Sequence, residues 1–180
     1  MAVIIMEMVG QSHGKYYYPT FSGVAQSYNY YPISYMKREE GIAFTALGLG
    51  RTIVEGGQAL RFSPYYPDIL PQFHSVKSTI TNSQNSFYAL NLNSGENPLK
   101  KGEEENLNQY NLETAEKHNQ LPHIASVVIS EDNILRESLK YKGPRVITFS
   151  SIIKYNFFPL NNILNEFIKE GENFIGCPLE

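Results

Sequence analysis

Short runs of apolar, β-branched and aromatic residues recur along this chain, separated by glycine, proline or polar clusters. Such runs are typical of β-strands joined by turns. The strand candidates are residues 2–9, 41–47, 59–62, 87–92, 125–129 and 145–149, with two more short runs between residues 16 and 31. Only residues 159–169 show clear helical periodicity. The sequence therefore predicts an α+β fold with a mainly antiparallel sheet and few helices.

The predicted helix at residues 159–169 has its apolar side chains at helical spacing. They form one stripe: Leu160, Ile163, Leu164, Phe167 and Ile168. Pro159 suits the first helical position, Lys169 the last turn and Gly171 the end. The run at residues 2–9 is apolar apart from Glu7, which predicts a strand covered on both faces.

Length and composition narrow the class of protein. The 180 residues suit a single domain spanning residues 1–180, in which the polar segment 93–119 is expected to be an exposed loop or insertion. A net charge of −3 with scattered Lys and Arg argues against nucleic acid as a partner. A single cysteine, Cys177, makes a reducing, cytoplasmic setting the default. No apolar run reaches the ~18–20 residues of a membrane span, so no membrane partner is expected.

The stretch "GIAFTALGLGRTIVEGGQALRFSP", residues 41–64, contains four glycines and two arginines. It does not match the dinucleotide fingerprint, because Ile53 stands where the third glycine belongs, and it lacks the lysine of a Walker loop. Glycines at 48 and 50 could still let backbone amides approach a phosphate, with Arg51 or Arg61 as a charged clamp. The residues alone leave open whether this is a phosphate loop or a tight bend with solvated arginines at its rim.

Other chemistry-bearing residues give no motif. Glu39, Glu40 and Glu55 do not form a metal-ligand pattern by themselves, and the four histidines show no metal-ligand spacing. No G-x-S-x-G motif marks a catalytic serine.

Five segments, taken in order, carry a resemblance to a known family. They are "AVIIMEMVG", "FSGVAQSYN", "ALGLGRTIVEGGQALRFSP", "GPRVITFSSIIK" with "FPLNNIL", and "GCPLE". This series resembles the nucleotide-binding domain of the pyruvate phosphate dikinase and phosphoenolpyruvate synthase family, over most of the chain except its polar middle. The resemblance implies an ATP-grasp fold, with ATP held between two lobes and this chain as the C-terminal part of that domain.

The resemblance also implies an activity. In this family Mg-ATP phosphorylates a histidine on a separate swivelling domain, and that phosphoryl group later reaches pyruvate or another acceptor on a further domain. The expected cofactors are therefore ATP and Mg²⁺. The expected partners are ATP, a phosphohistidine domain and a pyruvate or phosphoenolpyruvate domain of a longer parent chain. Catalysis by residues 1–180 alone is not expected, because the acceptor histidine and part of the acidic motif lie outside them.

The glycine loop supplies most of the residues that can be transferred from the family. Gly48 and Gly50 match the glycines of the family's loop, and Arg51 stands where the synthases have glutamate. Arg61 falls at the dikinase arginine beside the phosphates, and is the expected catalytic residue. Tyr28 replaces an arginine that is common in the family.

The two ends of the chain supply the other transferred residues. The strand expected at residues 2–9 would border the adenine, so Met6 and Glu7 are expected to contact the nucleotide; Met6 stands where the family often has glutamine. Glu180 matches the first acid of the family's metal-binding motif, and is the expected Mg²⁺ ligand.

Two other functions remain open from the sequence. The departures at Met6, Tyr28 and Arg51 favour a non-catalytic binding or regulatory module that retains the fold. The many tyrosines would also suit a carbohydrate-handling or structural β-domain.

Overall fold

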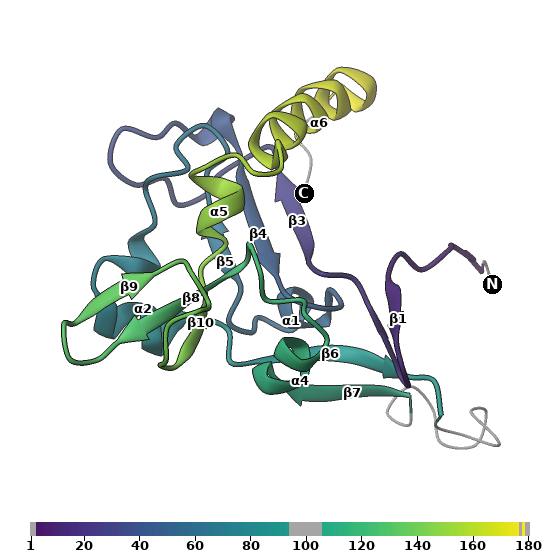
Figure 1. The fold of residues 1–180 in the computed structure, drawn as a ribbon. Helices are drawn as coiled ribbons and strands as arrows, with labels where there is room; N and C mark the ends of the chain where they lie inside the picture. The colour runs from purple at the N-terminus through teal and green to yellow at the C-terminus, as the bar shows by residue number, and fades with distance from the viewer. Residues whose placement is uncertain (1–2, 94–105, 177, 179–180) are drawn as a thin grey trace.

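The computed structural model describes residues 3–93, 106–176 and 178. In these residues ten strands form three antiparallel sheets, with strand orders β1-β2-β6-β7, β3-β4-β5 and β10-β8-β9 (Figure 1). The strands are β1 (Gln11–His13), β2 (Tyr16–Tyr18), β3 (Ser22–Gln26), β4 (Ile42–Ala46), β5 (Leu60–Phe62), β6 (Ser86–Asn91), β7 (Leu107–Asn111), β8 (Ala125–Ile129), β9 (Ile134–Arg136) and β10 (Arg145–Ile147). The helices are η1 (Arg38–Glu40), α1 (Arg51–Val54), η2 (Pro71–Phe73), α2 (Val76–Asn82), α4 (Leu112–Lys117), α5 (Ser150–Ile153) and α6 (Leu160–Ile175). The predicted α+β class with mainly antiparallel sheets is confirmed.

The core joins the three sheets through large side chains that are fully buried. Tyr18 of β2, Phe62 of β5, Phe87 of β6 and Ile147 of β10 belong to one apolar cluster, together with Leu160 at the start of α6. The rings of Tyr18 and Phe87 lie 4.8 Å apart and tilted, a favourable aromatic geometry. Burial of this cluster is the main force that holds the sheets together.

Residues 3–9 differ from the buried strand that the sequence predicts. They form no strand, and Ile4 and Ile5 are 85% and 91% exposed. The segment is tied to the first sheet where the Tyr17 hydroxyl donates to the Met8 carbonyl oxygen at 2.8 Å. An apolar run is buried only where another layer covers it, and none of the described residues forms such a layer here.

The C-terminal helix is longer than the sequence predicts. Helix α6 begins at Leu160, with Pro159 as its N-cap, and continues through Gly171 to Ile175. Its end lies at Gly176, whose φ of 76° is the left-handed conformation of a glycine C-cap. Gly171 costs the helix about 1 kcal/mol but does not stop it, because a stop requires a change of backbone conformation. In the described part of the chain, no helix is long and apolar enough to cross a membrane.

The predicted exposed segment 93–119 is partly ordered structure. Residues 94–105 lie outside the described residues, but β7 pairs with β6, and α4 follows it directly. The Asn111 side chain caps α4 by accepting from the amide of Thr114, and Ala115 is fully buried. The prediction of a loop is therefore wrong for residues 107–117, because pairing with β6 supplies the order that their polar composition does not indicate.

Two histidines join the first sheet to α4. The rings of His13 and His118 stack with centroids 5.2 Å apart, and the Tyr18 hydroxyl shares a hydrogen bond of 2.8 Å with His118 Nδ1. Burial lowers the pKa of both imidazoles, and the neighbouring His13 lowers the pKa of His118 further. Burial also raises the pKa of Tyr18, so its hydroxyl stays protonated and is hydrogen-bonded to the neutral imidazole of His118.

These lowered pKa values predict a loss of stability in acid. The unfolded chain binds protons at His13 and His118 near pH 6.5, whereas the folded chain binds protons at these two residues only at lower pH. The free energy of unfolding should therefore be highest above about pH 7 and should fall as pH drops through about 6.5. Urea denaturation at several pH values across this range measures the pH dependence of the free energy of unfolding. His118→Gln should flatten the dependence, while the exposed control His74→Gln should not; equal slopes in all three proteins would contradict the assignment.

Candidate functional site

The glycine loop at residues 48–50 forms a turn that is fixed against β6. Gly48 follows β4 with a φ of 84°, and the Leu49 amide donates to the Tyr88 carbonyl oxygen at 2.9 Å. A Cβ at position 48 would lie 2.7 Å from that same carbonyl oxygen. Gly48 is thus required both by its backbone conformation and by this close approach. Gly50 has an ordinary φ of −62° and is the N-cap of α1.

Arg51, the first residue of α1, belongs to a small polar network. Its Nε donates to Glu55 Oε1 at 2.6 Å, and its guanidinium carbon lies 5.2 Å from the centre of the Tyr88 ring. The Tyr88 hydroxyl donates to the other oxygen of Glu55 at 3.3 Å. Both partners of the ion pair are partly exposed, so it contributes little to stability and can exchange partners.

A buried glutamine connects this loop to β6. Gln84 Oε1 accepts from the Leu47 amide at 2.7 Å. Its Nε2 donates to the Leu47 carbonyl at 3.0 Å and to the Ser86 carbonyl at 2.8 Å. The side chain therefore behaves like an added piece of backbone between β4 and β6, and it holds the glycine turn in place.

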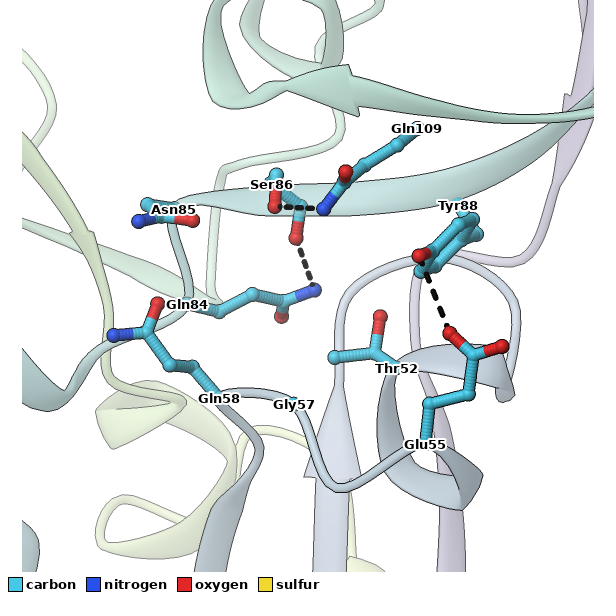
Figure 2. A pocket seen from close by; sticks show the side chains of 9 residues that line it. All are labelled: Thr52, Glu55, Gly57, Gln58, Gln84, Asn85, Ser86, Tyr88 and Gln109. Carbon is cyan, nitrogen blue, oxygen red and sulfur yellow. Dashed lines mark hydrogen bonds between the residues drawn. The ribbon is translucent and has the colours of Figure 1, made fainter.

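An open cavity of about 270 Å³ lies between α1 and the strands β6 and β7. Nearly all the side chains around it are polar (Figure 2): Thr52, Glu55, Gln58, Gln84, Asn85, Ser86, Tyr88 and Gln109, with Gly57 completing the wall. Hydrogen bonds order part of this wall. Gln109 Nε2 donates to Ser86 Oγ at 2.7 Å, and Gln58 Nε2 donates to the Thr81 carbonyl at 2.8 Å.

Thr52 contributes a buried oxygen without a partner. The residue is only 6% exposed, and its Oγ1 has no hydrogen-bond partner among the residues that the structure describes. In Figure 2 the oxygen points from α1 into the space between Gln84 and Tyr88. A buried hydroxyl without a partner costs free energy, which is an indication of a ligand or water at this place. Gly57 keeps the wall close, because a Cβ there would lie 2.8 Å from the Thr52 carbonyl oxygen.

Arg61 lies on β5 and uses a different set of partners. Its Nη2 donates to Asn29 Oδ1 at 2.9 Å and to the Tyr31 carbonyl at 2.8 Å. Its backbone amide donates to Gln72 Oε1 at 2.7 Å. Arg61 therefore secures the loop after β3, whereas Arg51 contacts two residues of the polar cavity. The sequence places the two arginines in one stretch, and the structure does not bring them into one network.

The remaining predicted site residues lie apart from the cavity wall or beyond the described chain. Met6 is 82% exposed, and Glu7 is exposed beside it in the segment that forms no strand. Glu180, the expected metal ligand, lies outside the described residues. Within residues 3–93, 106–176 and 178, no group of three or more His, Cys, Asp or Glu side chains could hold a metal ion.

Sequence reasoning did not identify the polar cavity. Thr52, Tyr88 and Gln109 are separated by tens of residues along the chain, and no spacing pattern relates them. The one sequence signal nearby is the pair Gly56 and Gly57, which marks the bend that closes the wall.

Comparison with known proteins gave no family assignment: no family model matches the chain, and no curated protein or solved structure gives a significant match.

Proposed function

We propose that this chain is the ATP-binding part of a phosphotransferase that resembles phosphoenolpyruvate synthase and pyruvate phosphate dikinase. The observation that carries the proposal is the glycine turn at the end of β4, which leads directly into Arg51 next to an open cavity. The ordered series of segments that resembles the family supports it as well. In the parent protein, Mg-ATP would phosphorylate a histidine on another domain of the chain, in the cytoplasm.

Arg51 fits a role in phosphate binding. Its guanidinium is permanently charged and offers donors in a planar fork. Its pairing with Glu55 is partly exposed, so a polyphosphate could replace that carboxylate at small cost. The turn at Gly48 brings backbone close to the same place. Mg²⁺ would offset charge on the phosphates, and the expected ligand Glu180 supplies the hard oxygen that this ion prefers.

Binding of Mg-ATP tests the proposal. Isothermal titration calorimetry of the folded protein should show saturable heat with Mg-ATP. Arg51→Ala should weaken the affinity by about ten- to a hundredfold, because hydrogen bonds to charged groups contribute about 1.5–3 kcal/mol. The matched control is Arg136→Ala. Arg136 is an exposed arginine at the end of β9, and its guanidinium lies over the ring of Tyr141. A folded protein without ATP-dependent heat, or equal losses in both variants, would overturn the proposal.

A non-catalytic binding or regulatory module is the second candidate, and Arg61 favours it. The expected catalytic guanidinium is occupied by Asn29 and the Tyr31 carbonyl, as in a structural role. In this case Arg61→Ala should lower the melting temperature and leave the ATP turnover of the parent protein unchanged. A large drop in turnover at unchanged melting temperature would instead restore Arg61 to catalysis.

A further inference from the structure

We propose that the polar cavity beside α1 binds a neutral, hydroxyl-rich sugar ring. The groups around it are mainly hydroxyls and carboxamides, contributed by Thr52, Gln58, Ser86, Tyr88 and Gln109. Such groups both donate and accept hydrogen bonds. A sugar hydroxyl also does both, so a ring that carries several hydroxyls is the ligand whose bonding capacity matches this wall. The inference does not depend on the nucleotide proposal, which rests on Arg51 and the glycine turn.

The charge of the cavity argues for a neutral ligand. Among the described residues the lining itself contains no Lys, Arg or His, and the neighbouring Arg51 guanidinium is paired with Glu55, so an anion inside the cavity would find no positive charge that is not already offset. In the described part of the chain Glu55 is the only carboxylate of this lining, and it already accepts from Arg51 and from Tyr88. Because its charge is offset in this way, the cavity has no strong preference for a cation.

Several acceptors and one buried hydroxyl remain available. The amide nitrogens of Gln58 and Gln109 are used at 2.8 Å and 2.7 Å, whereas the structure gives their amide oxygens no hydrogen bond within the described residues. The Thr52 Oγ1 has no partner either. The amide of Gln84 is fully occupied by backbone, which makes it a fixed part of the wall and not a ligand contact. The amide oxygens of Gln58 and Gln109 and the Thr52 hydroxyl come from separate segments, so they can contact different edges of one ring.

The size of the cavity selects a small ligand. Its volume of about 270 Å³ is just below the ~300–1,000 Å³ typical of sites for drug-sized molecules. A monosaccharide, or the ribose of a nucleoside, fits this range better than an oligosaccharide.

Two-dimensional ¹H–¹⁵N NMR of the whole protein provides the test, with D-glucose, D-ribose, adenosine and inorganic phosphate as separate probes. A sugar ring should shift the amides of Ser86, Tyr88 and the Gln109 side chain in a saturable way. Gln109→Leu, at an exposed position, and the isosteric Thr52→Val should each weaken this binding by about three- to tenfold, the value of one hydrogen bond. Gln11→Leu, at an exposed position on β1, is the matched control and should bind like the unchanged protein.

The four probes distinguish a free monosaccharide from the ribose of a nucleoside as the ligand. Saturation by glucose or ribose supports a free monosaccharide as the ligand, and saturation by adenosine alone supports a nucleoside ribose at the same wall. The proposal is overturned if no ring shifts these amides, if phosphate shifts them more strongly than any ring, or if Gln109→Leu binds as tightly as Gln11→Leu.

Discussion

Gly48→Ala is expected to lower the free energy of unfolding by about 2–5 kcal/mol. Two costs add: about 1–2 kcal/mol for a side chain in the left-handed region, and about 1–3 kcal/mol for overpacking. The second arises because the new Cβ would meet the Tyr88 carbonyl oxygen at 2.7 Å and the Phe87 side chain at 2.8 Å. Urea denaturation followed by circular dichroism measures this change.

Gly56→Ala is the matched control. Gly56 also has a positive φ, of 71°, but a Cβ there meets nothing within 4 Å. Gly56→Ala should therefore lower the free energy of unfolding only by the cost of a side chain in the left-handed region, about 1–2 kcal/mol. Equal losses at positions 48 and 56 would show that the glycine turn does not press against β6. If Gly48→Ala folds but loses ATP affinity, the turn has a ligand role beyond its structural one.

Gln84→Leu is expected to cost about 3 kcal/mol, or a drop of about 6–12 °C in melting temperature for a chain of this size. Leucine has a similar volume but leaves the amide and carbonyl of Leu47 and the carbonyl of Ser86 without this partner. Leu47 is fully buried, so water cannot easily replace the lost bonds. Differential scanning calorimetry measures the shift.

Gln58→Leu serves as the control for that substitution. Gln58 is exposed and makes one side-chain hydrogen bond, to the Thr81 carbonyl. Its loss should change the melting temperature by no more than about 2–4 °C, the shift that corresponds to roughly 1 kcal/mol. A Gln84→Leu protein as stable as Gln58→Leu would mean that the link between β4 and β6 is not a stabilising element.

The sequence allowed the larger strands to be located, because their signal is local. Residues 125–129 coincide with β8, residues 41–47 include all of β4, and residues 87–92 cover most of β6. Helix α2 has no apolar stripe in its sequence, VKSTITN, and depends on its cap: the Ser75 side chain accepts from the Ser78 amide. Helix α4 is equally polar. Hydrophobic periodicity could not predict either helix, because tertiary contacts and capping determine whether they form.

The candidate site divides in the same way. Gly48 and Arg51 could be recognised because they are close in sequence. Gln84 reaches Leu47 across 37 residues, and no pattern along the chain encodes such a bond. Residues 3–9 show the opposite error: their composition indicates burial, but burial depends on a covering layer that the run itself does not contain.

The strand order of the first sheet has a consequence for how the chain reaches its fold. β2 pairs with β6, so that Tyr17 lies opposite Leu90. In the sequence, the whole β3-β4-β5 sheet lies between these two residues. Closing so long a loop in an unstructured chain carries an entropy cost that grows with its length. The intervening sheet consists of consecutive hairpins, which need only short-range closures. When this sheet is formed, the chain between Ser22 and Phe62 is already paired, so the effective loop between β2 and β6 is reduced to the connections on either side of the sheet. The Leu49 amide of the glycine turn bonds to the Tyr88 carbonyl oxygen, so this turn links the locally closed sheet to the strand of the distant pairing.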